Sequence, residues 1–291
     1  MSEFTINLKS KILFGPTDVS VIVPDPSESL NPKEFYSSGK KYKVLWLLHG
    51  GNGDRNDWIC YTNIGQYAMQ REVMVVIPNA LNSDFANHPE FADGYNFSDF
   101  FFDELMPFIY NWLPASDDPK NNFVAGFSMG GAGTWLYGLC HPEKFMGIAP
   151  LSSSPREYGF LEPYRNLTSG EFRAKVMADK KAFPSGYGDP KNGMLMKEIN
   201  MIAKYSTVGD FLDSYECTWE RFREVAAAGK LPKIYVACGT EDRSYEKLLR
   251  FRKYAEELGV NGIAYDFVAG YGHSFKFWND VMPKVLDFFD V

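Results

Sequence analysis

Short apolar runs rich in β-branched and aromatic residues recur along this chain, and segments with helical periodicity lie between several of them. Such runs are typical of buried strands, whereas apolar positions three or four residues apart are typical of the helices that cover a sheet. Their alternation predicts an α/β fold with a mainly parallel sheet. The clearest strands are expected at Tyr42–Leu48, Val73–Pro78, Phe123–Phe127, Gly147–Leu151, Lys233–Ala237 and Ile263–Val268.

Two earlier strand candidates, near Phe4–Leu13 and Asp18–Pro24, extend the expected sheet at one edge to eight strands. Apolar side chains at helical spacing favour a surface helix at Tyr245–Leu258, which Gly259 ends as a normal C-cap. The other helices are expected at Phe100–Trp112, Gly131–Leu139 and Phe275–Phe289. We expect residues 1–291 to form a single domain.

Residues 152–230 interrupt this rhythm, because they contain no convincing strand and several Gly and Pro signals. We interpret them as a helical insertion over the sheet, after the sixth strand. The insertion is either a lid that shapes an apolar pocket or an ordinary extra layer of packed helices.

Composition narrows the class of protein. A net charge of −7 argues against nucleic-acid binding, which depends on clustered Lys and Arg. No apolar run reaches membrane-spanning length, and no secretory signal is visible at the N-terminus. The four cysteines lack the close spacing of a zinc site or a redox pair. These features predict a reduced, cytoplasmic protein, with a secreted form that has lost its leader as the alternative.

Ser128 stands where the run Phe123–Phe127 stops and a helix is expected to begin, between Gly126 and Gly130. A Gly-x-Ser-x-Gly turn between strand and helix is typical of a nucleophilic serine, because the tight turn leaves no room for side chains at the glycines. The helix amino terminus then faces developing negative charge, so the Met129 N–H is one candidate oxyanion donor. The alternative is a Gly-rich turn with an idle serine.

The apolar strand that ends at Leu48 leads into His49, Gly50 and Gly51, upstream of the serine. A loop in this position donates the second oxyanion N–H in such folds, and Gly51 is the preferred donor because no side chain obstructs it. We expect His49 to support the turn instead of acting as a base.

The general base follows by elimination among four histidines. His141 lies too far along the helix after Ser128, and His88 lies in a polar loop where a solvated side chain is expected. His273 follows the last strand and precedes the last helix, which places it at the same edge of the sheet as Ser128.

The orienting carboxylate should lie between the serine and the histidine in the chain. Asp242 follows the strand Lys233–Ala237 and can hold the imidazole in the required tautomer, with Glu241 as the neighbour to exclude. A solvated loop acid is the alternative for either residue. A Ser128, Asp242, His273 triad performs acyl transfer without a metal or an organic cofactor.

These residues resemble the esterase D-like branch of the α/β-hydrolases, which includes tributyrin, feruloyl and acetylxylan esterases and S-formylglutathione hydrolases. The resemblance implies an α/β-hydrolase fold with helices on both faces of the sheet, the same triad, and Gly51 and Met129 as oxyanion donors. It is carried by Leu47–Gly53, Asp57–Trp58, Phe102–Leu105, Gly126–Gly131, Gly239–Asp242, Gly272–His273 and Phe277–Trp278.

Tributyrin or feruloyl esterases are the closer likeness within that branch. The S-formylglutathione hydrolases resemble one another in a cysteine in the oxyanion loop and a histidine before the serine, where this chain has Asn52-Gly53-Asp54 and Phe127. Trp58 and Phe127 are the candidates for substrate contact, and packing beneath the loop is the equal alternative for Trp58.

The sequence therefore predicts a serine carboxylesterase that hydrolyses small acetyl, butyryl or feruloyl-type esters, with carbohydrate esters as one option. A thioesterase such as an S-formylglutathione hydrolase and a non-catalytic ligand-binding homologue are the alternatives; a peptidase carries less weight. No nucleic acid or membrane partner is expected, and a homo-oligomer stays open.

Overall fold

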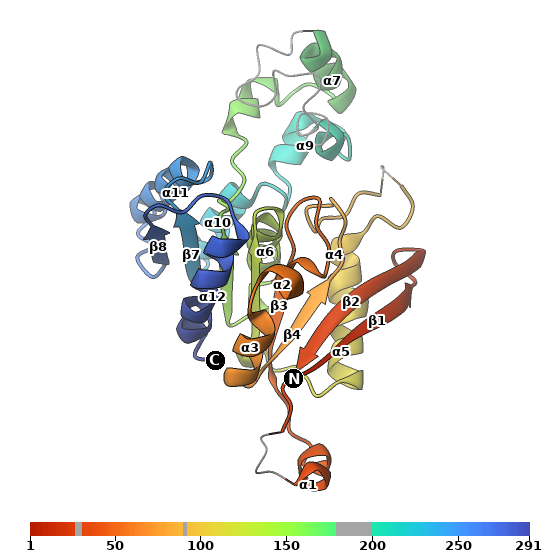
Figure 1. Cartoon of the computed structure of the whole chain (residues 1–291). Helices are drawn as coiled ribbons and strands as arrows, with labels where there is room; N and C mark the ends of the chain where they lie inside the picture. Colours follow the sequence, from red (N-terminus) through yellow and green to blue (C-terminus); the bar gives the residue numbers. More distant parts are fainter. Residues whose placement is uncertain (27–30, 90–91, 179–198) are drawn as a thin grey trace.

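A computed structural model describes residues 1–26, 31–89, 92–178 and 199–291. Its centre is an eight-stranded sheet in the order β1-β2-β4-β3-β5-β6-β7-β8 (Figure 1). The two edge pairings, β1 with β2 and β2 with β4, are antiparallel, and all the others are parallel. The strands are β1 Ser2–Ser10, β2 Gly15–Val23, β3 Lys43–Leu48, β4 Val73–Pro78, β5 Asn122–Phe127, β6 Gly147–Leu151, β7 Lys233–Gly239 and β8 Ala264–Val268.

Strand β3 explains why the apolar runs are continuous. Successive side chains of a strand point to opposite faces, so Val44 and Trp46 enter one core while Leu45 and Leu47 enter the other. Both faces are covered by helices, and a strand buried on both faces needs an apolar side chain at every position. The predicted mainly parallel eight-stranded sheet with helices on both faces is confirmed.

One face of the sheet packs against α2, α3 and α12, and the other packs against η1, α5, α6, α10 and α11. The helices are α1 Pro32–Ser37, α2 Asp57–Tyr61, α3 Ile64–Gln70, α4 Phe97–Asp99, η1 Phe100–Leu105, α5 Met106–Trp112, η2 Pro119–Asn121, α6 Met129–Cys140, η3 Pro142–Lys144, η4 Gly159–Tyr164, α7 Ser169–Ala178, α9 Val208–Leu212, α10 Thr218–Ala227, α11 Tyr245–Glu257 and α12 Phe275–Phe289. None of these described helices has both the length and the apolar character needed to cross a membrane.

The helix expected at Phe100–Trp112 is not uniform. Its first part, η1, is a π-helix, and its second part, α5, is an α-helix. The change in winding coincides with Pro107, which has no N–H to donate to the carbonyl of Asp103. The short helices α1, α2 and α3 were not predicted, because five to seven residues are too few to establish a helical period.

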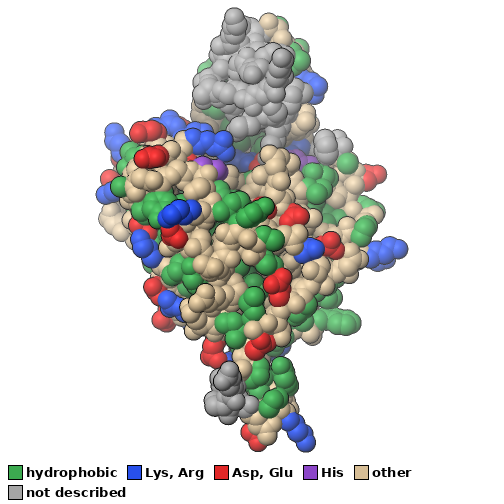
Figure 2. Space-filling view, in the orientation of Figure 1, with side chains coloured by type: hydrophobic (Ala, Val, Ile, Leu, Met, Phe, Trp, Pro, Cys, Tyr) green, Lys and Arg blue, Asp and Glu red, His purple; other side chains and the backbone are tan. Residues whose placement is uncertain are grey.

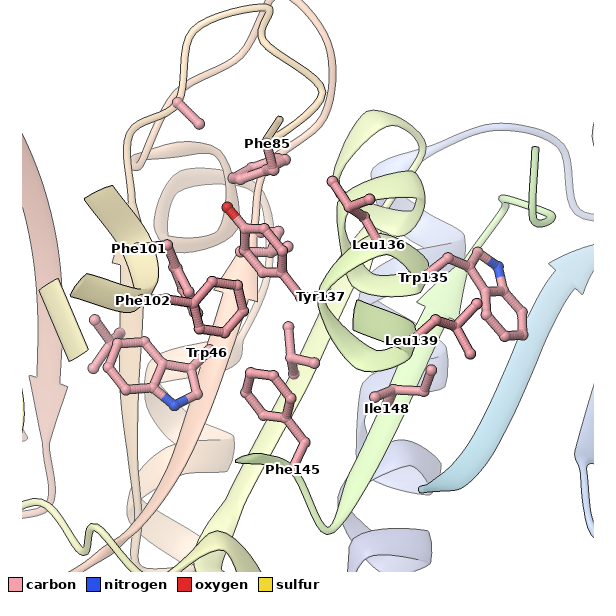
Figure 3. Packing of buried hydrophobic residues seen from close by; sticks show 14 of the residues in the cluster. Trp46, Phe85, Phe101, Phe102, Trp135, Leu136, Tyr137, Leu139, Phe145 and Ile148 are labelled. Atoms are coloured by element: carbon pink, nitrogen blue, oxygen red, sulfur yellow. The ribbon is translucent and has the colours of Figure 1, made fainter. Parts of the chain in front are cut away.

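An aromatic cluster joins β3 to the helices on one face (Figure 3). The ring centroids of Trp46 and Phe101 lie 5.1 Å apart, and those of Phe101 and Tyr137 lie 4.5 Å apart. The indole Nε1 of Trp46 donates a 2.9 Å hydrogen bond to Asn122 Oδ1, which also accepts from the Tyr110 hydroxyl. The buried polar atoms in this cluster are therefore paired, and η1, α5 and α6 are fixed against the sheet.

The segment of residues 152–230 follows β6, as predicted, and its described part contains η4, α7, α9 and α10. Residues 179–198, which the predicted insertion includes, lie outside the described residues. Helices α7 and α9 stand above the edge of the sheet at which β6 ends (Figure 1). They share a small core of their own, which includes Phe172, Val208 and Phe211. A role as a lid and a single-domain organisation stay predictions.

Buried charges attach the base of this segment to the loop after β4. The Arg156 guanidinium pairs with the Asp84 carboxylate at 2.8 Å. Lys204 pairs with Glu216, and the side chains of both are almost fully buried. Lys204 Nζ also donates to the backbone carbonyl of Asn87 at 2.6 Å.

On the surface, acidic and basic side chains are interspersed over the face shown in Figure 2.

The aromatic cluster generates a prediction about stability. Replacing Trp46 with Ala should lower the free energy of unfolding by about 3–5 kcal/mol, because it leaves a cavity and removes the indole hydrogen bond to Asn122. Urea denaturation measures the change. Trp112→Ala is the matched control: its side chain is 77% exposed on α5, so the loss should stay within about 0.5 kcal/mol. Equal losses in the two variants would contradict the assignment.

Candidate active site

A single residue, Ser128, makes the turn between β5 and α6. Its backbone has φ 55° and ψ −114°, a conformation that non-glycine residues adopt rarely and at a cost in energy. The Ser128 N–H donates to the carbonyl of Leu151, and the Ser128 carbonyl accepts from the N–H of Ala132, both at 3.0 Å. The predicted strand, turn and helix therefore meet in a strained elbow at Ser128.

The glycines on either side of Ser128 are required by close backbone contacts. A Cβ on Gly126 would lie 2.5 Å from the carbonyl oxygen of Gly130, and a Cβ on Gly130 would lie 2.6 Å from that of His49. Backbone atoms cannot rotate away as a flexible side chain can. The start of α6 therefore packs directly on the ends of β3 and β5, as the Gly-x-Ser-x-Gly pattern indicated.

The loop after β3 lies beside the first residue of α6. A Cβ on Gly51 would lie 3.9 Å from the Cβ of Met129, so the structure brings together the two predicted oxyanion donors. Asn52, at φ 61°, is fixed by Asn82, whose Oδ1 accepts from the Asn52 N–H at 2.7 Å and whose Nδ2 donates to Asn52 Oδ1 at 3.0 Å. This pair of amides holds the loop in one conformation.

His49 has the structural role expected from the sequence. The Ala80 N–H donates to His49 Nε2 at 3.0 Å, so Nδ1 carries the proton and donates to the Gly50 carbonyl at 2.8 Å. The ring is fully buried, and burial lowers its pKa, which keeps the imidazole neutral. It links the loops that follow β3 and β4.

His273 and Asp242 form a hydrogen-bonded pair. His273 Nδ1 lies 2.8 Å from Asp242 Oδ2, and the backbone N–H of Ser244 donates to Asp242 Oδ1 at 2.8 Å. Burial raises the pKa of the Asp242 carboxyl, but hydrogen bonds from His273 and Ser244, helped by the Ser152 hydroxyl, outweigh it and lower the pKa below its ordinary value. Glu241 is exposed, and Asp242 is the carboxylate that is hydrogen-bonded to the imidazole.

The sheet brings Ser128, Asp242 and His273 to one edge. Ser128 follows β5, Asp242 follows β7 and His273 follows β8, and these strands run parallel with only β6 between β5 and β7. The Trp278 ring stacks on Phe127 at 3.9 Å and meets the His273 ring edge-on at 5.1 Å. One aromatic ring therefore spans the distance between the histidine and the residue before the serine.

The expectation for His88 was wrong. His88 is only 8% exposed, and its Nε2 donates to the Ser83 carbonyl at 2.8 Å while the ring packs against Tyr95. The polar loop folds back on itself, so the imidazole forms a hydrogen bond within the loop instead of being solvated. His141, at the end of α6, packs against Phe102 at 3.9 Å, away from the site as expected.

Trp58 and Phe127, the two candidates for substrate contact, lie beneath the loop after β3. Trp58 is fully buried and its Nε1 donates to the Leu48 carbonyl at 3.0 Å, while its ring packs against Phe127 at 5.0 Å. Phe127 is only 3% exposed. This geometry favours the packing alternative, and contact with a substrate stays a prediction.

The interpretation of the sequence overlooked Ser152 and Ser244 and assigned no role to Trp278. Ser152 is buried beside the Asp242–His273 pair, and its hydroxyl accepts a 3.0 Å hydrogen bond from Trp278 Nε1. The sequence feature that could have identified Ser152 is its position, because it directly follows β6 as Ser128 directly follows β5. Across the described part of the chain, no group of three or more His, Cys, Asp or Glu side chains could hold a metal ion.

Comparison with known proteins identifies the family and the fold of the chain. A family model described as "Putative esterase" matches residues 26–289. An acetyl esterase of Caldicellulosiruptor saccharolyticus is 27% identical over 99% of this chain and 97% of its own length. The fold is that of fluorophosphonate-binding serine hydrolase F of Staphylococcus aureus, with TM-score 0.75, 22% identity and coverage of 99% and 98% of the two chains.

A second solved structure has the same α/β-hydrolase fold. The S-formylglutathione hydrolase of Staphylococcus aureus gives a TM-score of 0.71 at 22% identity, with 99% of this chain and 98% of the other covered.

The elbow generates a prediction from backbone contacts. Gly130→Ala should remove nearly all hydrolytic activity and lower stability by roughly 2 kcal/mol or more, because the added Cβ meets the carbonyl oxygens of Leu48 and His49. Gly170→Ala is the control, since nothing lies within 4 Å of its Cβ position. Thermal unfolding and ester hydrolysis, measured together, check both. A fully active Gly130→Ala protein would contradict the close packing.

Asp242 generates a prediction about pH and stability. Its folded pKa lies below the ordinary 3.8, so folding favours the carboxylate and its stabilising contribution is fully present above that value. The contribution is lost as the pH falls through the lower folded pKa. Urea unfolding of the wild type and of Asp242→Asn, from about pH 7 down to about pH 3, should show the wild-type advantage shrinking at the acid end. An advantage that stays constant would contradict the sign.

Proposed function

The chain belongs to the esterase family, and on that premise we propose that it is a carboxylesterase in which Ser128, Asp242 and His273 form the catalytic triad. The observation that carries the proposal is the hydrogen bond between Asp242 and His273 at the sheet edge where the Ser128 elbow lies. This constellation has the parts that acyl transfer requires: a presented nucleophile, a base and a group that orients the base.

The reaction follows from these positions. His273 Nε2 accepts the proton of the Ser128 hydroxyl as the oxygen attacks the ester carbonyl carbon. The tetrahedral intermediate then collapses, and the alcohol leaves with the proton from His273. Water attacks the acyl-serine by the same route in reverse, which releases the carboxylic acid and restores the hydroxyl. Asp242 remains ionised and stabilises the imidazolium.

Stabilisation of the oxyanion is proposed for the N–H groups of Gly51 and Met129. Met129 is the first residue of a 12-residue helix, whose opening N–H groups lack partners within the helix and carry partial positive charge. The two hydrogen bonds between Asn52 and Asn82 hold the Gly51 loop in place before substrate binds. Such pre-positioned donors contribute about 10²–10³-fold each to the rate.

Short acyl and aryl-acyl oxygen esters are the proposed substrates, including acetylated or feruloylated carbohydrates. The acetyl esterase that aligns over nearly the whole chain supports a small acyl group. A protein of Aspergillus terreus named "Probable feruloyl esterase C", 28% identical over 42% of the chain, supports testing an aryl-acyl group. The S-formylglutathione hydrolase shares the fold, so a thioester is the second substrate to test.

A reducing, cytoplasmic location is also proposed. All four cysteines, Cys60, Cys140, Cys217 and Cys238, are unpaired. Proteins that fold in oxidising compartments commonly pair their cysteines, whereas cytoplasmic thiols are kept reduced.

A homo-oligomer remains a prediction that light scattering of the purified protein would decide.

Replacement of the nucleophile tests the proposal. Ser128→Ala should reduce kcat for p-nitrophenyl acetate and butyrate by roughly 10³-fold or more, because neither general base nor oxyanion donors can replace the lost hydroxyl. Ser206→Ala, at an exposed serine, is the matched control and should keep wild-type rates. Equal rates for Ser128→Ala and the wild type would remove the proposal.

The same assay separates the alternatives. Methyl ferulate and an S-acyl glutathione, assayed beside the p-nitrophenyl esters, rank oxygen esters against thioesters by kcat/KM. A protein that hydrolyses none of them, and whose Ser128 is not labelled by a fluorophosphonate, would be a binding protein on a hydrolase scaffold.

A further inference from the structure

Ser152 has a strained backbone and is buried beside the proposed triad. It is 1% exposed, and its φ of 52° lies in the region that favours glycine. Its N–H donates to the Ala237 carbonyl at 2.8 Å, which ties the end of β6 to β7 just before Asp242. A serine at a position where glycine would fit better indicates that the hydroxyl itself has a use.

The Ser152 hydroxyl is held by an indole that also contacts the other members of the site. Trp278 Nε1 donates to Ser152 Oγ at 3.0 Å. The same ring stacks on Phe127, with ring centroids 3.9 Å apart and an interplanar angle of 15°. It lies edge-on to the His273 ring, with centroids 5.1 Å apart and an interplanar angle of 90°. Trp278 is 4% exposed, so these contacts are made in a site with little water.

Ser244 closes the connection to Asp242. Its hydroxyl donates to the Ser152 carbonyl at 2.9 Å, and its backbone N–H donates to Asp242 Oδ1 at 2.8 Å. Because Asp242 accepts the Nδ1 proton of His273 through its other oxygen, the carboxylate is constrained on both sides. Two series of contacts therefore connect the indole of Trp278 to the imidazole of His273. One runs through Ser152, Ser244 and Asp242, and the other is the direct contact between the two rings.

We propose that Ser152 and Trp278 form a positioning pair that holds Asp242 and His273 in the orientation needed for proton transfer from Ser128. Neither residue touches the reacting atoms. Their effect is transmitted through the carboxylate and the edge of the imidazole. The proposal deepens the proposed function and rests on it.

We expect the Ser152 hydroxyl also to influence the pH at which the site becomes active. The Ser152 hydroxyl favours the ionised carboxylate of Asp242, together with His273 and Ser244. Without it the carboxylate is more basic and stabilises the imidazolium more strongly. Loss of Ser152 should therefore move the acid limb of the pH profile of kcat/KM to higher pH.

Other ionisable groups around the pair do not account for such a movement. Burial raises the pKa of the Cys238 thiol to about 12, so this group at the end of β7 stays neutral. The neighbouring loop, α11, the β8–α12 connection and the start of α12 contribute side chains that are exposed or partly exposed to solvent: Glu241, Arg243, Tyr245, Tyr271 and Lys276.

The test uses Ser152→Gly and Trp278→Phe. Glycine accepts the positive φ, so it removes the hydroxyl without backbone conflict, and phenylalanine keeps an aromatic ring but lacks the N–H. Ser152→Gly should lower kcat for p-nitrophenyl acetate roughly tenfold, leave KM within about twofold and raise the acid limb by about 0.5 pH unit. Trp278→Phe should shift it in the same direction by less. Ser152→Ala is the second variant should Ser152→Gly fail to fold.

Trp135→Phe is the matched control. Trp135 is also a buried tryptophan, and its Nε1 donates to the carbonyl of Ser153 at 3.1 Å, one residue from Ser152 but outside the series. It should lose comparable stability in urea and keep the wild-type pH profile. The double variant Ser152→Gly/Trp278→Phe should cost less than the sum of the single losses in kcat, because both remove the same unit.

Two outcomes would overturn this inference alone, and a third would overturn the proposed function as well. If the wild type shows Ser128-dependent hydrolysis but the acid limb is unmoved in both variants, Ser152 and Trp278 only stabilise the fold. If Trp135→Phe shifts the limb as much as Trp278→Phe, any buried tryptophan has this effect. Absence of Ser128-dependent hydrolysis in the wild type would defeat the proposed function itself and this inference with it.

Discussion

The site depends on the direct contact between the start of α6 and the ends of β3 and β5. Gly126 and Gly130 allow backbone to meet backbone there, and this contact sets both the φ of Ser128 and the place of Met129 beside Gly51. The strain at the serine persists because the sheet and the helix are each fixed by large apolar cores. The packing of the sheet and its helices therefore holds the Ser128 hydroxyl in place.

The other groups reach the serine by a sequence of hydrogen bonds across neighbouring strand ends. Ser128 bonds to the end of β6, Ser152 bonds to β7, and Thr240, just before Asp242, bonds to β8. Each step moves one strand along the sheet. Ser128 thus shares one edge of the sheet with Asp242 and His273, which lie more than a hundred residues later in the chain. Trp278 packs between Phe127 and His273.

Features with a local cause were predictable from the sequence. The eight strands and the elbow follow from apolar runs and two glycines, and Asp242 and His273 follow from their place after β7 and β8. Features with a tertiary cause were not. The burial of His88 depends on a loop that folds back on itself, and the role of Ser152 depends on an indole 126 residues away. The π-helical start at Phe100 was equally hidden, because winding is not encoded by apolar spacing.

The separate core of the segment after β6 bears on how such a protein can diversify. Phe172, Val208 and Phe211 pack with one another and not with the sheet, and the connection below them is made by the charged pairs of Arg156 and Lys204. Substitutions within that small core leave the two cores of the sheet intact. Substitutions can therefore accumulate above the site without disturbing the packing that forms the elbow beneath it.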